Sequence, residues 1–166
     1  QHSADTFVGD FVGAAVYQAD DGSILSQKDF SNGLRPVKIP VDVALDEEIT
    51  DDIMSQVRGL LGAGNWLGSQ TRPDVCVLVS QAMQRGRKIT YRDLKKINHI
   101  VRRAKQDCEL GIKIPSIPRE ERIYVSSGDA SLANNEDLSS QAGHLVMVTS
   151  KRLLRGERAP WGLLTW

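Results

Sequence analysis

Residues 71–108 read TRPDVCVLVSQAMQRGRKITYRDLKKINHIVRRAKQDC, and they carry two consecutive helical patterns. The first begins at Thr71, which is followed by Pro73 near the first turn and by Asp74 three residues on. This order is that of a capping box with Asp in place of Glu, so we expect Thr71 to open a helix. The apolar stripe of that helix would consist of Val75, Leu78, Val79, Ala82 and Met83.

The second pattern predicts an amphipathic helix from about Thr90 to Cys108. Its apolar face comprises Leu94, Ile97, Val101, Ala104 and Cys108. Its other face is mostly basic and comprises Arg92, Lys95, Lys96, Arg102 and Arg103. We therefore expect one face to pack in a core and the other to meet solvent or a partner.

A further helix is expected upstream, beginning at the acidic cluster Asp46–Glu48, because negative charge is favoured at a helix start. Apolar residues recur there at helical spacing, namely Ile49, Ile53, Val57, Leu60 and Leu61. The glycines between Gly59 and Gly68 weaken the helix propensity, and close packing against a neighbour would explain them. The segment Ser31–Leu45 is interpreted as a linker.

Strand patterns flank this helical region on both sides. Residues Phe11–Gln18 and the pair Ile24 and Leu25, separated by a turn at Asp20–Gly22, predict a hairpin. After Gly111 we expect a loop with Pro115 and Pro118, and then three strands, at Ile123–Ser127, His144–Thr149 and Leu163–Trp166. A polar loop containing Asn134, Asn135, Glu136 and Asp137 would join the first two. The predicted class is α+β: a hairpin plus helices in 1–114, then a three-stranded antiparallel meander in 115–166.

The composition suits a globular protein, since 40% of the 166 residues are hydrophobic and 25% are charged. No apolar run approaches the roughly 18 residues of a membrane helix, and we expect an intracellular, cytoplasmic or nuclear, protein without a membrane partner. Cys76 and Cys108 are interpreted as buried free thiols, because no nearby His pair completes a zinc site. The chain starts at Gln1 and ends in an apolar run at Trp166, and we expect it to be cut from a longer one.

The formal net charge is zero, but the charge is unevenly distributed along the chain. The first third is acidic, whereas the middle is basic, and this asymmetry indicates a polyanionic partner. Phosphate contacts are predicted for Arg85, Arg87, Lys88, Arg92, Lys95, Lys96, Arg102 and Arg103. The alternative is a solvated helix face, but only Asp93 interrupts the cations, so pairing within the helix does not explain them.

Three stretches occur in a recognisable order. They are FVGAAVYQADDGSILSQKDF at Phe11–Phe30, GNWLGSQTRPDVCVLVSQAMQ at Gly64–Gln84, and RIYVSSGDASLANNEDLSSQAGHLVMVTSKR at Arg122–Arg152. Together they resemble the Pol polyprotein of copia-type retrotransposons, from the end of the reverse transcriptase into the ribonuclease H domain. The resemblance implies a thumb- or connection-like segment in 1–114 and the truncated start of a ribonuclease H-like domain in 115–166.

For the parent protein, the resemblance implies an RNA-directed DNA polymerase, a nucleotidyltransferase, with Mg²⁺-dependent ribonuclease H activity. Two Mg²⁺ ions held by carboxylates would carry that cleavage, and Asp129 would be the first ligand and a catalytic residue. The chain departs from the family pattern, because Ser131 and Leu132 stand where the family has a second Asp and a Trp. A bland alternative is that Asp129 is a turn residue beside Gly128.

The polymerase signature, a Tyr-x-Asp-Asp turn, is absent, so we expect this chain to be inactive alone. Glu136 and Asp137 are interpreted as solvated charge. The expected partners are an RNA–DNA hybrid or other nucleic acid and the remainder of the Pol polyprotein. Two alternatives stay open: a non-catalytic nucleic-acid-binding remnant, and a degenerate fragment without function.

Overall fold

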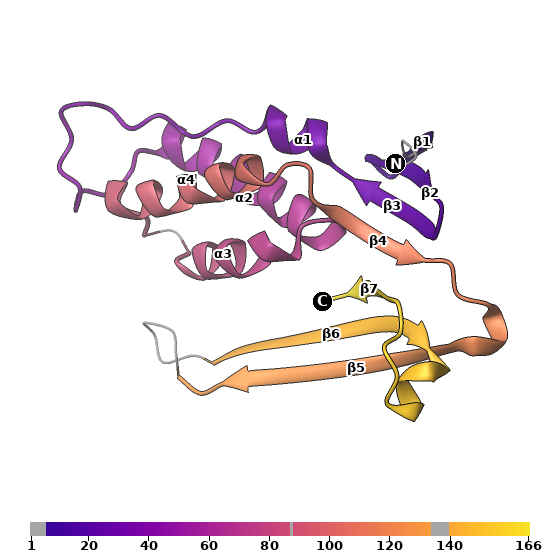
Figure 1. Cartoon of the computed structure of the whole chain (residues 1–166). Coiled ribbons are helices and arrows are strands. Elements are labelled where there is room, and N and C mark those ends of the chain that lie inside the picture. Colours follow the sequence, from indigo (N-terminus) through magenta and orange to yellow (C-terminus); the bar gives the residue numbers. More distant parts are fainter. Residues whose placement is uncertain (1–5, 87, 134–139) are drawn as a thin grey trace. The chain divides into compact units, whose positions relative to one another are not determined.

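The computed structural model describes residues 6–86, 88–133 and 140–166. Its helices and antiparallel strands confirm the α+β class. The chain divides into two compact units, a helical unit of residues 27–110 and a strand unit of residues 6–26 with 111–166 (Figure 1). The helical unit is thus inserted into the strand unit, and these units do not follow the sequence boundary near residue 115. The assignment of 1–114 and 115–166 to two parts of a parent protein stays a prediction.

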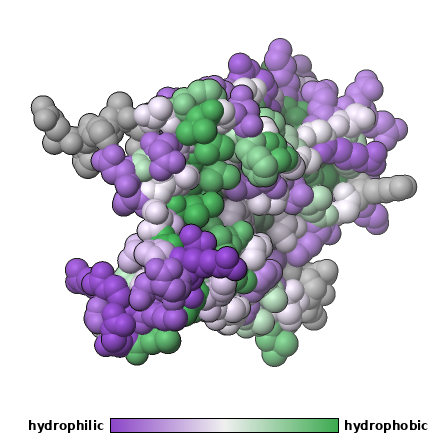
Figure 2. Space-filling model, turned by 90° about the vertical axis from the view of Figure 1, so that its right-hand side faces the viewer, coloured by the Kyte–Doolittle hydropathy of each residue, from purple (hydrophilic) through white to green (hydrophobic). Residues whose placement is uncertain are grey.

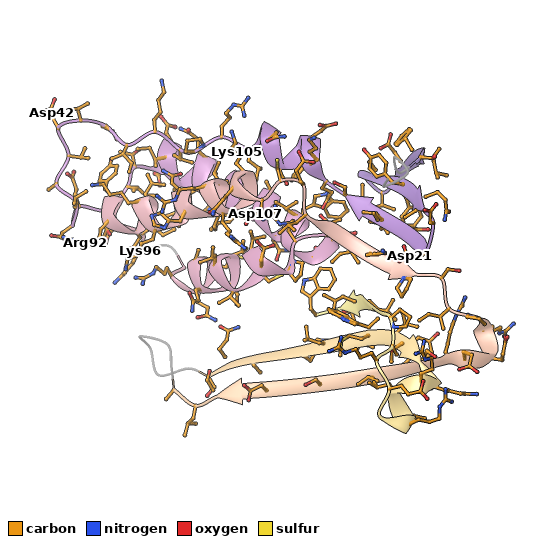
Figure 3. The ribbon with its side chains drawn as sticks, viewed as in Figure 1. Asp21, Asp42, Arg92, Lys96, Lys105 and Asp107 are labelled. Carbon is orange, nitrogen blue, oxygen red and sulfur yellow. The ribbon has the colours of Figure 1, made fainter. Side chains whose placement is uncertain are left out.

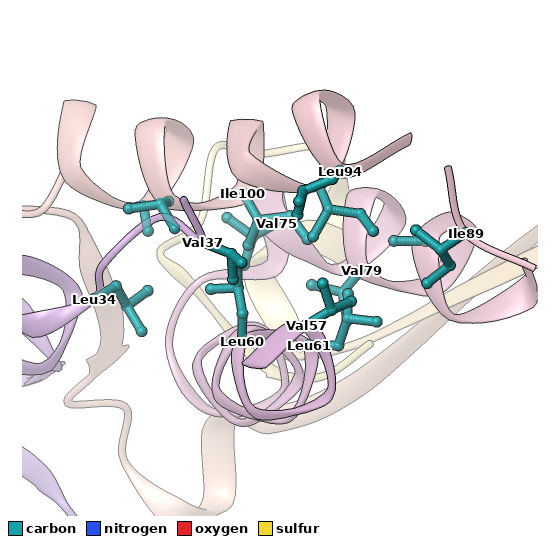
Figure 4. Close-up of a cluster of buried hydrophobic side chains, with 14 of the residues drawn as sticks. Leu34, Val37, Val57, Leu60, Leu61, Val75, Val79, Ile89, Leu94 and Ile100 are labelled. Carbon is teal, nitrogen blue, oxygen red and sulfur yellow. The ribbon is translucent and has the colours of Figure 1, made fainter. Parts of the chain in front are cut away.

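One hydrophobic core holds the helical unit together. Its helices are α1 (Lys28–Gly33), α2 (Asp51–Gln70), α3 (Pro73–Gln84) and α4 (Tyr91–Gln106). Figure 4 shows the core side chains of α2, α3, α4 and the segment after α1, which include Leu34, Val37, Val57, Leu60, Leu61, Val75, Val79, Ile89, Leu94 and Ile100. Each fully buried Leu, Ile or Val stabilises the fold by about 1.5–3 kcal/mol, so this cluster fixes the helix positions.

Helix α2 begins at Asp51, and the expected start at Asp46 is wrong. Thr50 is the N-cap, because its hydroxyl accepts a hydrogen bond from the amide of Ile53 at 3.4 Å. Asp51 and Asp52 in the first turn supply the negative charge that the sequence assigned to the earlier cluster.

The earlier acidic cluster lies instead in a turn that leads into an isolated β-bridge between Glu48 and Thr90, beside the start of α4. The amide of Ile49 donates to the carbonyl of Ile89 at 3.0 Å, and the amide of Tyr91 donates to the carbonyl of Glu47 at 3.1 Å. Nearer the start of the linker, Asn98 of α4 exchanges two 2.9 Å hydrogen bonds with the backbone of Val37. The linker between α1 and α2 is therefore tied to α4 at both places.

The predicted capping box at Thr71 and Asp74 is wrong, although Pro73 does start helix α3. Thr71 ends α2 as its C-cap, and its buried hydroxyl donates to Oε1 of Gln27 at 2.9 Å. Arg72 occupies the N-cap position of α3 without a side-chain capping bond. Asp74 turns towards arginines instead, because a tertiary partner is close enough to compete with the local cap.

The glycines of α2 are only partly explained by close packing. A Cβ atom on Gly64 would lie 3.0 Å from Cγ2 of Val79 and 3.1 Å from Cγ2 of Ile100. Gly68 faces α3 at a similar spacing, 3.0 Å from Sγ of Cys76. Gly59 and Gly62, in contrast, have no atom within 4 Å of a Cβ position, and packing does not account for them.

Helix α4 matches its sequence pattern closely. The predicted apolar residues Leu94, Ile97, Val101 and Ala104 are buried, and Thr90 is the N-cap. Thr90 and Asp93 form a reciprocal capping box that fixes the start of the helix. The helix ends before Cys108, which is a free thiol like Cys76, and both are half-buried rather than buried. In the part of the chain that is described, no helix has the length and apolar character to cross a bilayer.

The strand unit contains a sheet ordered β1-β2-β3-β4. Its strands are β1 (Thr6–Phe11), β2 (Ala14–Ala19), β3 (Gly22–Ser26) and β4 (Gly111–Pro115). The predicted hairpin is confirmed in β2 and β3, but the expected strand Phe11–Gln18 is divided by a turn at Val12 and Gly13, and Phe11 ends β1. The loop expected after Gly111 is wrong at its start, because β4 pairs antiparallel to β3 (Figure 1). Ser26 and Gly111 are partners in that pairing. The chain therefore leaves the sheet for the helical unit and returns to it at neighbouring positions.

The predicted antiparallel meander is confirmed as β5 (Arg122–Ser131), β6 (Gln141–Ser150) and β7 (Trp161–Thr165), in that order. The loop with Asn134, Asn135, Glu136 and Asp137 lies outside the described residues. Several apolar side chains of this sheet reach the surface, and Tyr124 and Trp161 are 68% and 61% exposed. Figure 2 shows, on one face of the molecule, hydrophobic residues at the surface among hydrophilic ones. The likeness to the front of a ribonuclease H fold stays a prediction.

Candidate nucleic-acid interface

The predicted phosphate-binding residues gather around helix α4. Helical spacing places Arg92, Lys95, His99 and Arg102 along the side of α4 that faces away from the buried stripe, and all of them are exposed. Lys96 lies at the edge of this side nearest α3, because it lines a cavity together with α3 residues. Figure 3 shows Arg92 and Lys96 projecting from α4 near its start. We call Lys95, Lys96, His99 and Arg102 the basic ridge.

Arg92 is held at the surface by an acidic residue of the linker. Its Nε and Nη2 atoms lie 3.0 and 2.9 Å from Oδ1 of Asp46. The hydrogen bond and the positive charge of Arg92 lower the pKa of Asp46 below its usual value. Both side chains are exposed, so the pair contributes little to stability and a phosphate could replace Asp46.

Two more of the predicted arginines are also bound to carboxylates. Nη1 of Arg85 lies 3.0 Å from Oδ1 of the largely buried Asp93. Arg103 contacts two acids, with Nε 2.8 Å from Oδ2 of Asp74 and Nη1 2.7 Å from Oδ2 of Asp107. These arginines hold α3 and α4 together, and their positive charge is partly compensated inside the protein.

The other predicted cations differ in their surroundings. Among the residues that the structure describes, no acidic group lies within ion-pair distance of Lys88, Lys95, Lys96 or Arg102. Arg102 places Nη2 2.9 and 2.8 Å from the ring nitrogens of His99. Arg87 lies outside the described residues. Positive charge without an ion-paired acid among the described residues therefore lies on the ridge and near the start of α4, and also elsewhere in the helical unit, for example at Lys38 and Arg58.

Arg72 is a structural residue that the sequence analysis missed. It is 1% exposed, and its Nε and Nη2 atoms each lie 2.8 Å from one carboxylate oxygen of Asp74. Its remaining donors reach the end of α4, the carbonyls of Ala104 at 2.8 Å and Arg103 at 3.1 Å. A positive charge is favoured at a helix C-terminus, so Arg72 both caps α4 and fixes it against α3. The sequence signal was the Arg between Thr71 and Pro73, which the capping-box interpretation left without a role.

The charge of Asp74 follows from this arrangement. Partial burial raises the pKa of Asp74, but the hydrogen bond from Arg72 and the charges of Arg72 and Arg103 outweigh burial. The pKa of Asp74 therefore lies below its usual value, and the carboxylate stays ionised at neutral pH.

Asp129 lies in strand β5, opposite Gly143 of β6 in the strand register, and it is exposed. Its Oδ1 accepts a 2.9 Å hydrogen bond from the amide of Ala130. Within the described ranges, no three His, Cys, Asp or Glu side chains are close enough together to hold a metal ion. Glu136 and Asp137 are not among the described residues. The position in a strand is what a ligand presented from a rigid element requires, and the metal role of Asp129 stays a prediction.

The candidate interface thus combines a core-anchored helix with the outward cations Lys95, Lys96 and Arg102. No protein-family model, curated protein or solved structure matches this chain.

Proposed function

We propose that this chain contacts the phosphate backbone of nucleic acid, an RNA–DNA hybrid above all, through helix α4. The observation that carries the proposal is the basic ridge, whose Lys95, Lys96 and Arg102 point outward without acidic partners among the described residues. The buried face of α4 keeps the helix rigid, so the cations are displayed on a fixed element. Lysine and arginine bind phosphate without sequence preference, which suits a protein that follows a backbone.

The salt dependence of such binding has an expected size. Each phosphate neutralised by the protein lowers the logarithm of the binding constant by about 0.9 per tenfold rise in salt on duplex DNA, and somewhat less on single strands. The three ridge cations Lys95, Lys96 and Arg102 thus predict a slope of about −3 on a logarithmic plot. Binding that does not weaken with salt would contradict the proposal.

The test is fluorescence anisotropy with a labelled RNA–DNA hybrid, measured over a series of salt concentrations. The variant Lys95→Gln with Arg102→Gln should bind more weakly and lower the salt slope by about 2, because two phosphate contacts are lost. The matched control is Lys38→Gln with Arg58→Gln, which removes one exposed lysine and one exposed arginine elsewhere in the helical unit. If both double variants bind equally, the ridge is not the interface.

The wider proposal is that the parent protein is a copia-type reverse transcriptase with ribonuclease H activity, and that this chain is inactive alone. The order of the three resembling stretches supports it, as does the position of Asp129 in a strand of an antiparallel meander. The measurement is cleavage of a labelled hybrid by the chain with Mg²⁺. Cleavage that is abolished by Asp129→Ala would refute inactivity of the chain while supporting the catalytic role of Asp129.

The alternative of a non-catalytic nucleic-acid-binding remnant rests on the same ridge. The remnant is distinguished from a part of an enzymatic parent by an exchange experiment. Residues 115–166 replace the segment that begins the ribonuclease H domain of a complete ribonuclease H-type enzyme. Mg²⁺-dependent cleavage by the hybrid enzyme, lost on Asp129→Asn, supports the enzymatic parent. Folding of the hybrid enzyme without cleavage supports the remnant.

A further inference from the structure

A cavity of about 100 Å³ lies between helices α3 and α4, beside the basic ridge. Its apolar wall consists of Leu78 and Ala82 from α3 and Ile97 from α4. Ala82 and Ile97 are buried members of the core, whereas Leu78 is 37% exposed and stands at the mouth. The wall is therefore a rigid apolar surface that opens to solvent.

Charged groups line the rest of the cavity, and they are arranged to favour an anion. Asp93 is engaged by its neighbours: Oδ2 accepts from the amide and the hydroxyl of Thr90, and Oδ1 pairs with Arg85. Its charge is thus used to fix the guanidinium of Arg85 at the cavity. Lys96 adds a second cation, for which the described residues offer no acidic partner. Two cations against one engaged carboxylate leave a net positive field at the opening.

The cavity is continuous with the basic ridge, because Lys96 belongs to both. Lys95 directly precedes Lys96 in α4, and Arg102 lies six residues after Lys96, at a rise of about 1.5 Å per residue. A ligand that enters the cavity can therefore extend along the ridge cations beyond it. Figure 3 shows Lys96, which belongs to both the cavity and the ridge, near the start of α4. An extended polyanion fits this surface better than a single carboxylate does.

We infer that the cavity takes one unpaired nucleotide of a nucleic acid that lies along the basic ridge. Its phosphate would lie against Lys96 and Arg85, and an edge of its base would lie against Leu78 and Ile97. A base within a duplex is enclosed by its neighbours and cannot enter, whereas an unpaired base exposes an apolar face and carries its own phosphate. The cavity volume of about 100 Å³ leaves room for the edge of one base. This inference rests on the proposed function and adds a preference to it.

The test compares two labelled RNA–DNA hybrids that carry the same number of phosphates. One is fully paired, and the other has a single unpaired nucleotide in its middle. We expect the whole chain to bind the second hybrid about tenfold more tightly, because the edge of the unpaired base buries apolar surface against Leu78 and Ile97. Leu78→Ser should abolish this preference, because it removes the apolar mouth of the cavity. Val77→Ser is the matched control, since Val77 is an exposed apolar residue of α3 outside the cavity, and it should keep the preference.

Each outcome decides between distinct conclusions. Equal binding of both hybrids, with a normal salt slope, would overturn the nucleotide site and leave the proposed function standing. Binding of neither hybrid would refute both. If a peptide of alternating Glu and Leu displaces the unpaired hybrid at lower concentration than a single-stranded oligonucleotide does, the cavity is a peptide site and the inference is wrong. Thermal melting shows whether the variants Leu78→Ser and Val77→Ser fold equally well. A further variant, Lys96→Gln, leaves the apolar wall intact and should also reduce the preference for the hybrid with the unpaired nucleotide.

Discussion

Replacing Arg72 by alanine is expected to destabilise the helical unit more than replacing any exposed arginine of that unit by alanine. Arg72 is buried at the junction of α2, α3 and the end of α4, and it makes four hydrogen bonds to Asp74 and to the carbonyls of Ala104 and Arg103. Its removal leaves the Asp74 carboxylate with Arg103 as its one charged partner among the described residues, and it uncaps the last turn of α4. A cavity of the size of the side chain would form as well.

The magnitude follows from the state of the groups that remain. Removing one partner of a buried ion pair costs about 3–5 kcal/mol, and the lower end applies here because Asp74 is partly exposed and keeps Arg103. We therefore expect the free energy of unfolding to fall by about 3 kcal/mol. If the helical unit of residues 27–110 unfolds by itself, each 1 kcal/mol lost from its free energy of unfolding lowers its melting temperature by roughly 4–8 °C. The decrease for Arg72→Ala should therefore exceed about 10 °C.

The assay is urea denaturation followed by circular dichroism, with Arg35→Ala as the matched control. Arg35 also donates to backbone carbonyls at a helix end, those of Asn32, Gly33 and Leu34, but its side chain is exposed. Water can replace its hydrogen bonds, so this variant should lose less than about 1 kcal/mol. Similar losses in the two variants would refute the reasoning that burial makes Arg72 the anchor of α4.

Three further predictions concern the same unit. Because the pKa of Asp74 is lowered in the folded state, its contribution to stability is fully present above its unfolded pKa and is lost as pH falls through the folded pKa. Acid titration of unfolding should thus show a stability loss below about pH 4 that is smaller in Asp74→Asn, and an unchanged profile would contradict the low pKa. Residues 27–110 alone should fold and melt cooperatively, because their hydrophobic core is self-contained and Lys28 and Glu109 pair at 2.7 Å near the two ends of the segment. A non-cooperative melt would show that the core needs the strand unit. Gly64→Ala should destabilise the chain, because the new Cβ would crowd Val79 and Ile100. Gly62→Ala, in open space on the same helix, should stabilise it by roughly 0.5–1 kcal/mol. Thermal melts that rank the two variants the other way would refute the packing of α2 on α3.

The elements with strong local patterns could be predicted from the sequence. Helix α4 has an apolar stripe and a basic face within a few turns, and both faces lie where the sequence places them. The strands β5, β6 and β7 were likewise predicted from short β-prone runs separated by polar residues. The outward position of Lys95, Lys96 and Arg102 follows from the same periodicity, so the ridge of the candidate site was visible in the sequence.

Tertiary structure alone decided the features that join distant segments. Strand β4 is five residues long. It becomes a strand because β3, which precedes the helical unit in the sequence, offers it a backbone partner. The residues Thr71–Asp74 form a good local capping signal, yet the carbonyls at the end of α4 and the charge of Arg103 draw Arg72 and Asp74 into another arrangement. Which cations are compensated was equally undecidable, because Asp46 and Arg92 lie far apart in sequence. Periodicity is encoded within one element, whereas hydrogen bonds and ion pairs between elements depend on which distant residues the fold brings together.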